Sequence, residues 1–251
     1  MAIFNIARAV PPAQPWLKAL IYGVTGSGKS LTSLMMAKYI ADRVEGRVCV
    51  IDTELTDNSD PRQGKISEYA SHPLVPQFDV MRLPDHMPQT VEKAFLYLVN
   101  EIQCYKVVII DGISPMWEQA NFFAETNGGY PLGRLAANKM MDAMMRAFIT
   151  SPIHGIFTSR CKMEYARRET IGKGGSTRTI VEAAGLVPVF RDQNLYDFKS
   201  IFHMRADHTC EVVSTKYQPL DGGSFPSPGG VNPELFAHIG ASLGLPEEAL
   251  G

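Results

Sequence analysis

Short hydrophobic runs alternate with longer segments of helical spacing along most of the chain. The runs at residues 17–22 (LKALIY) and 107–111 (VVIID) contain few polar positions, which is typical of strands buried on both faces. From Lys29 to Val44 the apolar residues recur at intervals of three and four, which predicts a helix. This alternation predicts an α/β fold with a mainly parallel central sheet between two layers of helices. Further strands are expected at 47–52, 78–83 and 153–159, and further helices at 88–103, 115–126 and 132–150.

The last third of the chain has a different pattern. Residues 162–179 are polar and basic around a Gly-Lys-Gly-Gly sequence, which predicts a mobile loop. Residues 198–204 and 210–216 predict the two strands of a C-terminal β-hairpin. Gly, Pro and Ser dominate residues 222–233, which predicts a linker or surface loop, and residues 232–243 predict an amphipathic helix. The expected parts are an N-terminal arm at 1–16, a core at 17–221, and a linker with a C-terminal helix at 222–251.

Composition places the chain among ordinary globular proteins. Its 251 residues are 45% hydrophobic and 20% charged, with a net charge of −2, which excludes a mainly disordered, collagen-like or coiled-coil chain. No run approaches the roughly 18 apolar residues of a membrane span, and residues 1–16 lack the apolar core of a signal peptide. The four scattered cysteines predict free thiols in a reducing compartment. We therefore expect a cytoplasmic protein that does not contact a membrane.

The strongest chemical signal is the segment Gly23-Val24-Thr25-Gly26-Ser27-Gly28-Lys29-Ser30. It matches the phosphate-loop pattern G-x-x-x-x-G-K-[ST] in full, and it lies between a predicted strand and a predicted helix. Glycines let backbone N–H groups surround phosphate oxygens, and the helix N-terminus adds partial positive charge. Lys29 is expected to reach the β- and γ-phosphates, and the Ser30 hydroxyl to bind Mg²⁺. The segment through Leu31 therefore predicts a binding site for ATP and Mg²⁺.

Two acidic residues at strand ends are candidates to complete this site. Asp111 ends the strand at 107–111, so we expect it at the carboxyl edge of the sheet, where it would hold Mg²⁺ with Ser30. The next residue is Gly112, whereas many ATPases have a second acid there. Glu54 is the candidate for activating water, provided that its strand neighbours the phosphate-loop strand. Glu54 and Lys29 are thus the expected catalytic residues; the alternatives are a helix-capping role for Asp111 and a solvated loop position for Glu54.

Over roughly residues 17–221 the sequence resembles RecA-like ATPases. The phosphate loop, the Ile51-Asp52-Thr53-Glu54 ending and the apolar strand before Asp111 occur in the same order as in that family. Segments such as Thr158–Tyr165 look like the small phage-encoded proteins described as nucleotide-binding AAA proteins, some of which act in single-strand annealing or recombination. The resemblance implies a three-layer RecA-like P-loop core. It also implies adenine contacts by Asp60 and Arg62, and a γ-phosphate sensor at Ser159 or Arg160.

The same resemblance implies a nucleic-acid partner. In RecA-like recombinases a DNA-binding loop follows the sensor, and residues 160–178 take that place with six basic and two acidic residues, a net charge of +4. Basic side chains suit the phosphates of a single strand, and Tyr165 is a candidate for stacking on a base. The alternative is a solvated lid that binds no DNA. The expected DNA contacts are Lys162, Arg167, Arg168, Lys173 and Arg178.

In RecA-like filaments a basic residue of the adjacent subunit reaches the γ-phosphate, and Lys216 is the candidate here, with an ordinary surface lysine as the alternative. The leading interpretation is a DNA-dependent ATPase that forms a homo-oligomer on single-stranded DNA, with ATP between subunits, in the cytoplasm of a bacterial host. A single-strand DNA-binding protein is a further candidate partner. Two other classes stay open: a small-molecule P-loop kinase with Arg167 and Arg168 as a closing lid, and an ATP-switched module that does not hydrolyse.

Overall fold

The computed structural model describes residues 15–54, 65–75, 77–171, 177–226 and 232–247, and eight strands of this part form one sheet. They are β1 (Lys18–Gly23), β2 (Arg47–Asp52), β3 (Phe78–Arg82), β4 (Tyr105–Asp111), β5 (His154–Ser159), β8 (Ser200–Met204), β9 (Thr209–Thr215) and β10 (Ser224–Pro226). The spatial order is β10-β9-β8-β1-β5-β4-β2-β3. From β8 to β3 all neighbours are parallel, and β9 and β10 are antiparallel. The predicted α/β fold with a mainly parallel sheet is therefore confirmed.

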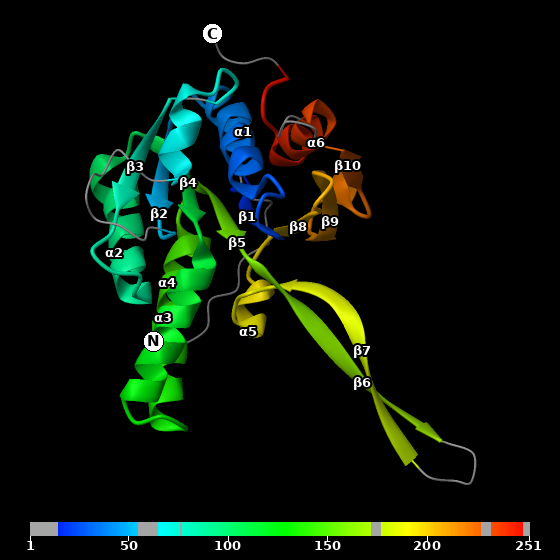
Figure 1. Ribbon diagram of the computed structural model, residues 1–251. Helices are drawn as coiled ribbons and strands as arrows, with labels where there is room; N and C mark the ends of the chain where they lie inside the picture. Colours follow the sequence, from blue (N-terminus) through cyan, green and yellow to red (C-terminus); the bar gives the residue numbers. More distant parts are fainter. Residues whose placement is uncertain (1–14, 55–64, 76, 172–176, 227–231, 248–251) are drawn as a thin grey trace, which may run out of the picture.

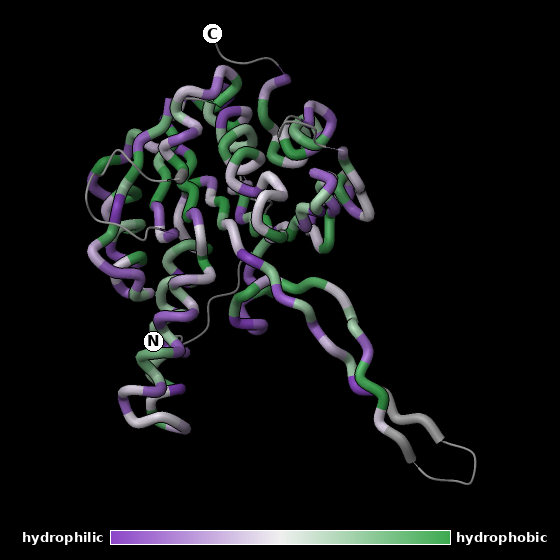
Figure 2. Tube along the Cα trace, viewed as in Figure 1, coloured by the Kyte–Doolittle hydropathy of each residue, from purple (hydrophilic) through white to green (hydrophobic). Residues whose placement is uncertain are grey.

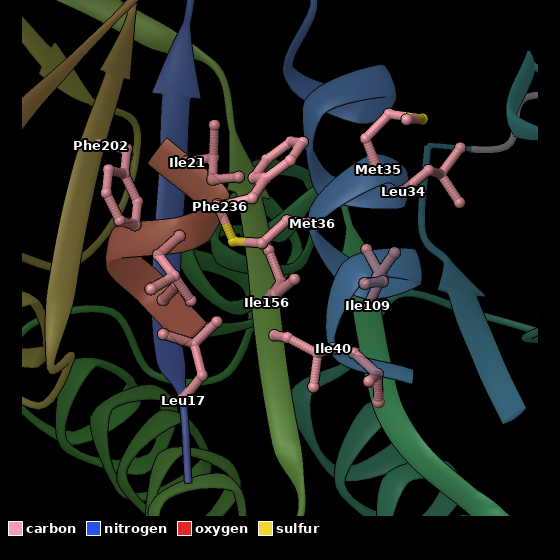
Figure 3. Packing of buried hydrophobic residues seen from close by; sticks show 14 of the residues in the cluster. Leu17, Ile21, Leu34, Met35, Met36, Ile40, Ile109, Ile156, Phe202 and Phe236 are labelled. Carbon is pink, nitrogen blue, oxygen red and sulfur yellow. The ribbon is translucent and has the colours of Figure 1, made fainter. Parts of the chain in front are cut away.

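Helices cover both faces of this sheet (Figure 1). One face carries α1 (Lys29–Ala41) and α6 (Pro233–Leu243), and the other carries α2 (Pro88–Tyr97), α3 (Ile113–Thr126) and α4 (Leu132–Thr150). Alternate residues of a strand face opposite sides, so Ile109 of β4 packs toward α1 while Val108 and Ile110 pack toward the other three helices. Figure 3 shows Met36 and Ile40 of α1 packed beside Ile109 and Ile156. Because β1 and most of β4 are buried on both faces, their sequences are almost continuously apolar.

Several short helices change the boundaries of the predicted elements. The helix expected at 88–103 ends as an α-helix at Tyr97 and continues as a π-helical turn, η2 (Leu98–Ile102). Further short helices are η1 (Lys65–Ser71), α5 (Asp192–Leu195) and η3 (Gln218–Leu220). The hairpin expected near residues 198–216 is present as β8 and β9. Among the described residues, none of the helices has both the length and the apolar character that a membrane span requires.

The prediction of a loop at residues 162–179 is wrong. β6 (Cys161–Ile171) and β7 (Thr177–Pro188) form a long antiparallel hairpin, separate from the main sheet, that projects from the body (Figure 1). We call this hairpin the arm. From Lys162 to Arg167 both of its faces are exposed, so no buried side imposes the apolar and polar alternation that marks a half-buried strand. The Gly-Lys-Gly-Gly sequence at 172–175 lies outside the described residues.

The C-terminal segment packs onto the sheet. Residues expected as a linker contain β10, which pairs with β9 and places Phe225 opposite Cys210. The Asn232 side chain accepts a hydrogen bond from the N–H of Leu235 at 2.8 Å and caps α6. α6 then buries Phe236 and other apolar residues in the same cluster as α1. Residues 1–14, most of the predicted N-terminal arm, lie outside the described part.

Candidate functional site

The glycine-rich loop between β1 and α1 lies at the carboxyl edge of the sheet. α1 packs over β4 and β5, so its first turn lies near the carboxyl ends of these strands. Gly26 and Gly28 have φ values of +82° and +92°, which glycine adopts without strain. The loop borders a cavity of about 680 Å³. Its described lining residues are Thr25, Gly26, Gly28, Lys29, Ser30, Leu31, Glu54, Ile66, Glu68, Tyr69, Asp111, Thr158, Arg160 and His208.

Ser30 and Asp111, the two predicted metal ligands, are in direct contact. The Ser30 hydroxyl lies 3.1 Å and 3.2 Å from the two carboxylate oxygens of Asp111 and donates to them. The Thr158 hydroxyl donates to Asp111 Oδ1 at 2.6 Å and accepts the N–H of Gly112 at 2.8 Å. Thr158 therefore fixes the orientation of the Asp111 carboxylate toward the first turn of α1.

The electrostatics at Asp111 favour a cation. The residue is only 5% exposed, and burial, together with the nearby charges of Glu54 and Asp52, raises the pKa of its carboxyl to about 6 against the opposing effect of the hydrogen bonds from Thr158 and Ser30. A carboxylate oxygen beside a hydroxyl oxygen suits Mg²⁺, which takes few protein ligands and completes its shell with phosphate and water. The described residues contain no group of three or more His, Cys, Asp or Glu side chains placed to hold a metal. The donor set thus fits Mg²⁺ that arrives with a phosphate ligand.

Lys29 supplies the cation of the loop. Its Nζ donates to the carbonyl oxygen of Val24 at 2.8 Å and so bridges the loop from end to end. Burial lowers the pKa of Lys29, while the charges of Glu54 and Asp111 act in the opposite direction. A partly desolvated ammonium group beside a glycine-rich loop and a helix N-terminus is an arrangement that can bind phosphate groups.

Glu54 reaches the cavity by a different route from the one expected. β2 does not neighbour β1, because β4 and β5 lie between them. β2 instead pairs with β4, in a register that places Asp52 opposite Asp111. The turn after β2 is held by the Thr53 hydroxyl, which donates to the Asp111 carbonyl at 3.0 Å, and by the Glu54 N–H, which donates to Asp52 Oδ1 at 3.0 Å. This turn places the Glu54 carboxylate in the same cavity as Lys29.

Steric crowding explains why position 112 is a glycine, whereas many ATPases have a second acid after the strand-end Asp. The φ of Gly112 is +96°, and a Cβ atom at this position would lie 2.4 Å from Cγ of Glu54. Any side chain at position 112 would therefore collide with Glu54, and its backbone conformation would be strained. The space beside Asp111 is instead occupied by the side chain of Glu54, which follows β2 in the chain. Gly112 in the sequence therefore reflects the Glu54 side chain packed against it, but this relation could be recognised only from the structure.

The two sensor candidates lie in different environments. Arg160 lines the cavity, and its Nε donates to Oε1 of Glu54 at 3.3 Å. Ser159 is buried, and its hydroxyl lies 3.1 Å from that of Ser114 at the start of α3. Thr158, the neighbour of Ser159 in β5, lines the cavity. Arg160 and Thr158 are therefore the residues of this segment that face the site.

Further residues of the cavity had not been predicted. Ile66, Glu68 and Tyr69 come from η1, and His208 comes from the turn between β8 and β9. His208 Nδ1 lies 3.2 Å from the carbonyl oxygen of Ser27, and because a carbonyl only accepts, Nδ1 is the donor. These positions carry no local motif, since the strand order brings them to the site. In the sequence, His208 is marked only by its position between two strands that are predicted to form a hairpin.

Other predicted site residues lie elsewhere or outside the described part. Lys216 is exposed after β9, at the amino end of β8, and its N–H donates to the Lys199 carbonyl at 2.8 Å. The structure brings Lys216 into no contact with the cavity of its own chain among the described residues. Lys162 and Arg167 are exposed on the arm. Arg168 pairs in register with Ile180, and Arg178 with Thr170. Asp60, Arg62 and Lys173 lie outside the described residues.

The site is defined by its own residues. Strand ends of β1, β2, β4 and β5 bring a cationic loop, a hydroxyl–carboxylate pair, a second carboxylate and a guanidinium group to one cavity. This arrangement can bind polyphosphate with a divalent cation and can orient a water molecule. No family model matches the chain, and no curated protein matches it.

Proposed function

We propose that this chain binds ATP with Mg²⁺ and hydrolyses it, as a RecA-like P-loop ATPase. The observation that supports this most is the convergence of Lys29, the Ser30–Asp111 pair and Glu54 on one cavity of about 680 Å³. These residues come from the three strand ends that carry the resemblance to RecA-like ATPases. The fit of the Glu54 side chain into the space left by Gly112 strengthens the proposal, because a second carboxylate is thereby available beside the metal pair.

Each group has a role that follows from its chemistry. The loop N–H groups and Lys29 would bind the phosphates, and Ser30 and Asp111 would hold Mg²⁺, which when bound neutralises phosphate charge. Glu54 accepts a hydrogen bond from water and orients its oxygen toward the γ-phosphorus. The new P–O bond forms as the bond to the β–γ bridging oxygen breaks, and the proton that the water loses passes to Glu54 and then to solvent, which yields ADP and phosphate. Arg160 offers positive charge to the oxygens of the transferred group.

Single-stranded DNA is the proposed effector, bound by a homo-oligomer in recombination or annealing. The arm begins directly after Arg160, which contacts Glu54, so one chain segment joins the arm to the site. Residues 161–188 contain five basic and three acidic residues, a net charge of +2. Lys162 and Arg167 are exposed there and accessible to phosphates. ATP between subunits would bring a trans-acting cation, for which Lys216 is the candidate.

No structural observation favours the small-molecule kinase. That alternative requires Arg167 and Arg168 to close over the nucleotide. Arg167 is exposed on the arm and is not among the described residues that line the cavity.

The decisive experiment measures ATP turnover with and without single-stranded DNA. Replacing Glu54 by Gln removes the carboxylate that orients water, so we expect kcat to fall by about 10²- to 10⁴-fold while nucleotide affinity stays within a few-fold. Glu68→Gln is the matched control, because Glu68 also lines the cavity but lies on η1. Lys29→Ala should weaken binding itself.

Three results would contradict the proposal in different ways. A Glu54→Gln enzyme as active as the wild type would remove the assigned water-orienting residue. A wild type that binds ATP without turnover, with or without DNA, would favour the non-hydrolysing switch. DNA-independent transfer of phosphate to a metabolite would favour the kinase.

A further inference from the structure

The arm has an apolar face that the described residues leave open to solvent. Residues directly opposite each other in an antiparallel pair share a face. The register places Met163 opposite Leu186, Tyr165 opposite Ala183, and Arg167 opposite Val181. Met163, Tyr165 and Val181 are 45%, 63% and 59% exposed. We call Met163, Tyr165, Val181, Ala183 and Leu186 the arm face.

A two-stranded hairpin of this kind is not stable by itself. β6 and β7 pair only with each other among the described strands, over 11 and 12 residues. Isolated hairpins are at best marginally stable in water, because one pair of strands buries too little apolar surface. Figure 2 shows hydrophobic segments along the arm at a distance from the body. We therefore expect a second surface to cover the extended arm and stabilise it.

Four further exposed apolar residues lie at the end of α3, in the turn after it and at the start of α4. Phe122, Tyr130, Leu132 and Leu135 are 59%, 90%, 71% and 53% exposed, and we call these four residues the tip patch. A cavity of about 320 Å³ adjoins it, with Tyr130 and other residues of this helical hairpin in its wall. In Figure 1 the arm and the end of α3 and α4 project from the body at separate places. The arm of one chain therefore does not cover the tip patch of the same chain.

The arm and α3 carry charges of opposite sign. The arm has a net charge of +2, and α3 contains Glu118 and Glu125 and no Lys or Arg, whereas α4, which carries Leu132 and Leu135, adds Arg134, Lys139 and Arg146 against Asp142. Glu125 borders the cavity at the tip patch. Arg134 in the first turn of α4 is already engaged, since its guanidinium lies 4.9 Å from the centre of the Trp117 ring. An acidic helix beside an apolar patch is the kind of surface that the basic, apolar arm fits.

We propose that the arm face of one chain packs on the tip patch of a second copy. The two surfaces differ, so the contact is head-to-tail, and a pair of copies keeps one free arm on one copy and one free tip patch on the other. Such contacts build a ring if the rotation closes and a filament if it does not. This inference rests on the homo-oligomer that is part of the proposed function. Its test uses neither ATP nor DNA, so the contact between copies and the ATPase activity can each be disproved without the other.

The experiment is sedimentation velocity of the full chain over a range of protein concentrations. The arm variant is Tyr165→Ser with Val181→Ser, the tip variant is Tyr130→Ser with Leu132→Ser, and Tyr97→Ser is the control, a half-exposed tyrosine on α2. We expect the wild type and the control to form species larger than a dimer. Each double variant alone should lose tenfold or more in association constant and sediment as a monomer.

Mixing the variants tests the head-to-tail geometry. The arm variant keeps its tip patch and the tip variant keeps its arm face, so an equimolar mixture should form a dimer of one copy of each and grow no further. Unfolding curves that match the wild type would show that each variant is folded. A monomeric wild type, variants that still assemble, or a mixture that stays monomeric would overturn the inference. An arm variant that loses DNA binding but still assembles would assign the arm face to nucleic acid instead.

Discussion

At the residue scale, the carboxylates at the ends of β2 and β4 destabilise the fold that holds them. Burial raises the pKa of Asp111 to about 6 from 3.8 and also raises the pKa of Asp52. At about 1.4 kcal/mol per pKa unit, ionised Asp111 lowers the stability of the ligand-free protein by about 3 kcal/mol at neutral pH. A bound cation would remove this penalty. Under the proposed function, the site thus has lower stability without ligand and higher affinity for a metal–nucleotide complex.

Asp111→Asn should therefore stabilise the ligand-free protein at pH 7, by about 1–3 kcal/mol. The folded pKa of Asp111 lies above the unfolded one, so its contribution to wild-type stability is lost as the pH rises from about 4 to 6. This loss should be absent in the variant. Urea unfolding across this pH range measures both effects, and titration with nucleotide should show that Mg²⁺-dependent binding is lost. Glu101→Gln, at an exposed acid on η2, is the control, and a variant less stable than the wild type would contradict the expectation.

At the element scale, the arm combines two chemistries on one hairpin. Its basic residues suit phosphates, and the arm face suits an apolar partner. Lys162 lies on the opposite face of the hairpin from Met163 and Tyr165, because alternate side chains point in opposite directions, whereas Arg167 lies on the arm face opposite Val181. Its first strand starts directly after Arg160, so displacement of the arm base would act on the contact between Arg160 and Glu54.

Replacing Arg167, Arg168 and Lys173 together by Ala should reduce the salt dependence of DNA binding. Each lost phosphate contact lowers the slope of log K against log salt by about 0.7 for a single strand, so we expect a decrease of about 2. Fluorescence anisotropy of a labelled single strand at several salt concentrations gives the slope. The control replaces Lys93, Lys139 and Arg146, exposed on α2 and α4, by Ala. An unchanged slope in the arm variant would remove these residues from the DNA contact.

At the scale of the whole molecule, the C-terminal helix and the sheet share one buried cluster. Phe236 of α6 is 4% exposed and packs on Tyr39 of α1, with ring centres 5.9 Å apart. β10 extends the same sheet beside β9. Because these contacts join residues about 200 positions apart, the segment after residue 221 is expected to unfold together with the core.

Phe236→Ala should lower the free energy of unfolding of the whole chain by about 3–5 kcal/mol, since it removes a buried ring and leaves a cavity. Guanidinium unfolding followed by circular dichroism and by tryptophan fluorescence should give coincident transitions at a lower midpoint. Glu234→Ala, at an exposed position of the same helix, should change stability by less than about 0.5 kcal/mol. A separate early transition in the wild type would show that the C-terminal segment unfolds on its own.

Short-range features of this protein could be predicted from the sequence. The β1 strand, the glycine-rich loop and the start of α1 follow from apolar runs, helical spacing and glycines within about 25 residues. Asp111 at the end of an apolar strand predicted its place at the carboxyl edge, and its contact with Ser30 agrees with that prediction. These features depend on burial periodicity and backbone conformation, which adjacent residues determine.

The other residues of the site could be assigned only from the tertiary structure. The strand order places β4 and β5 between β1 and β2, yet the pairing of β2 with β4 brings Glu54 to the cavity and explains Gly112. Tyr69 and His208 join the site from elements distant in the chain. The arm escaped prediction because a strand exposed on both faces has no buried side to mark it. The sequence by itself thus determined the glycine-rich loop and the pairing of Ser30 with Asp111, whereas long-range packing decided which side chains surround them.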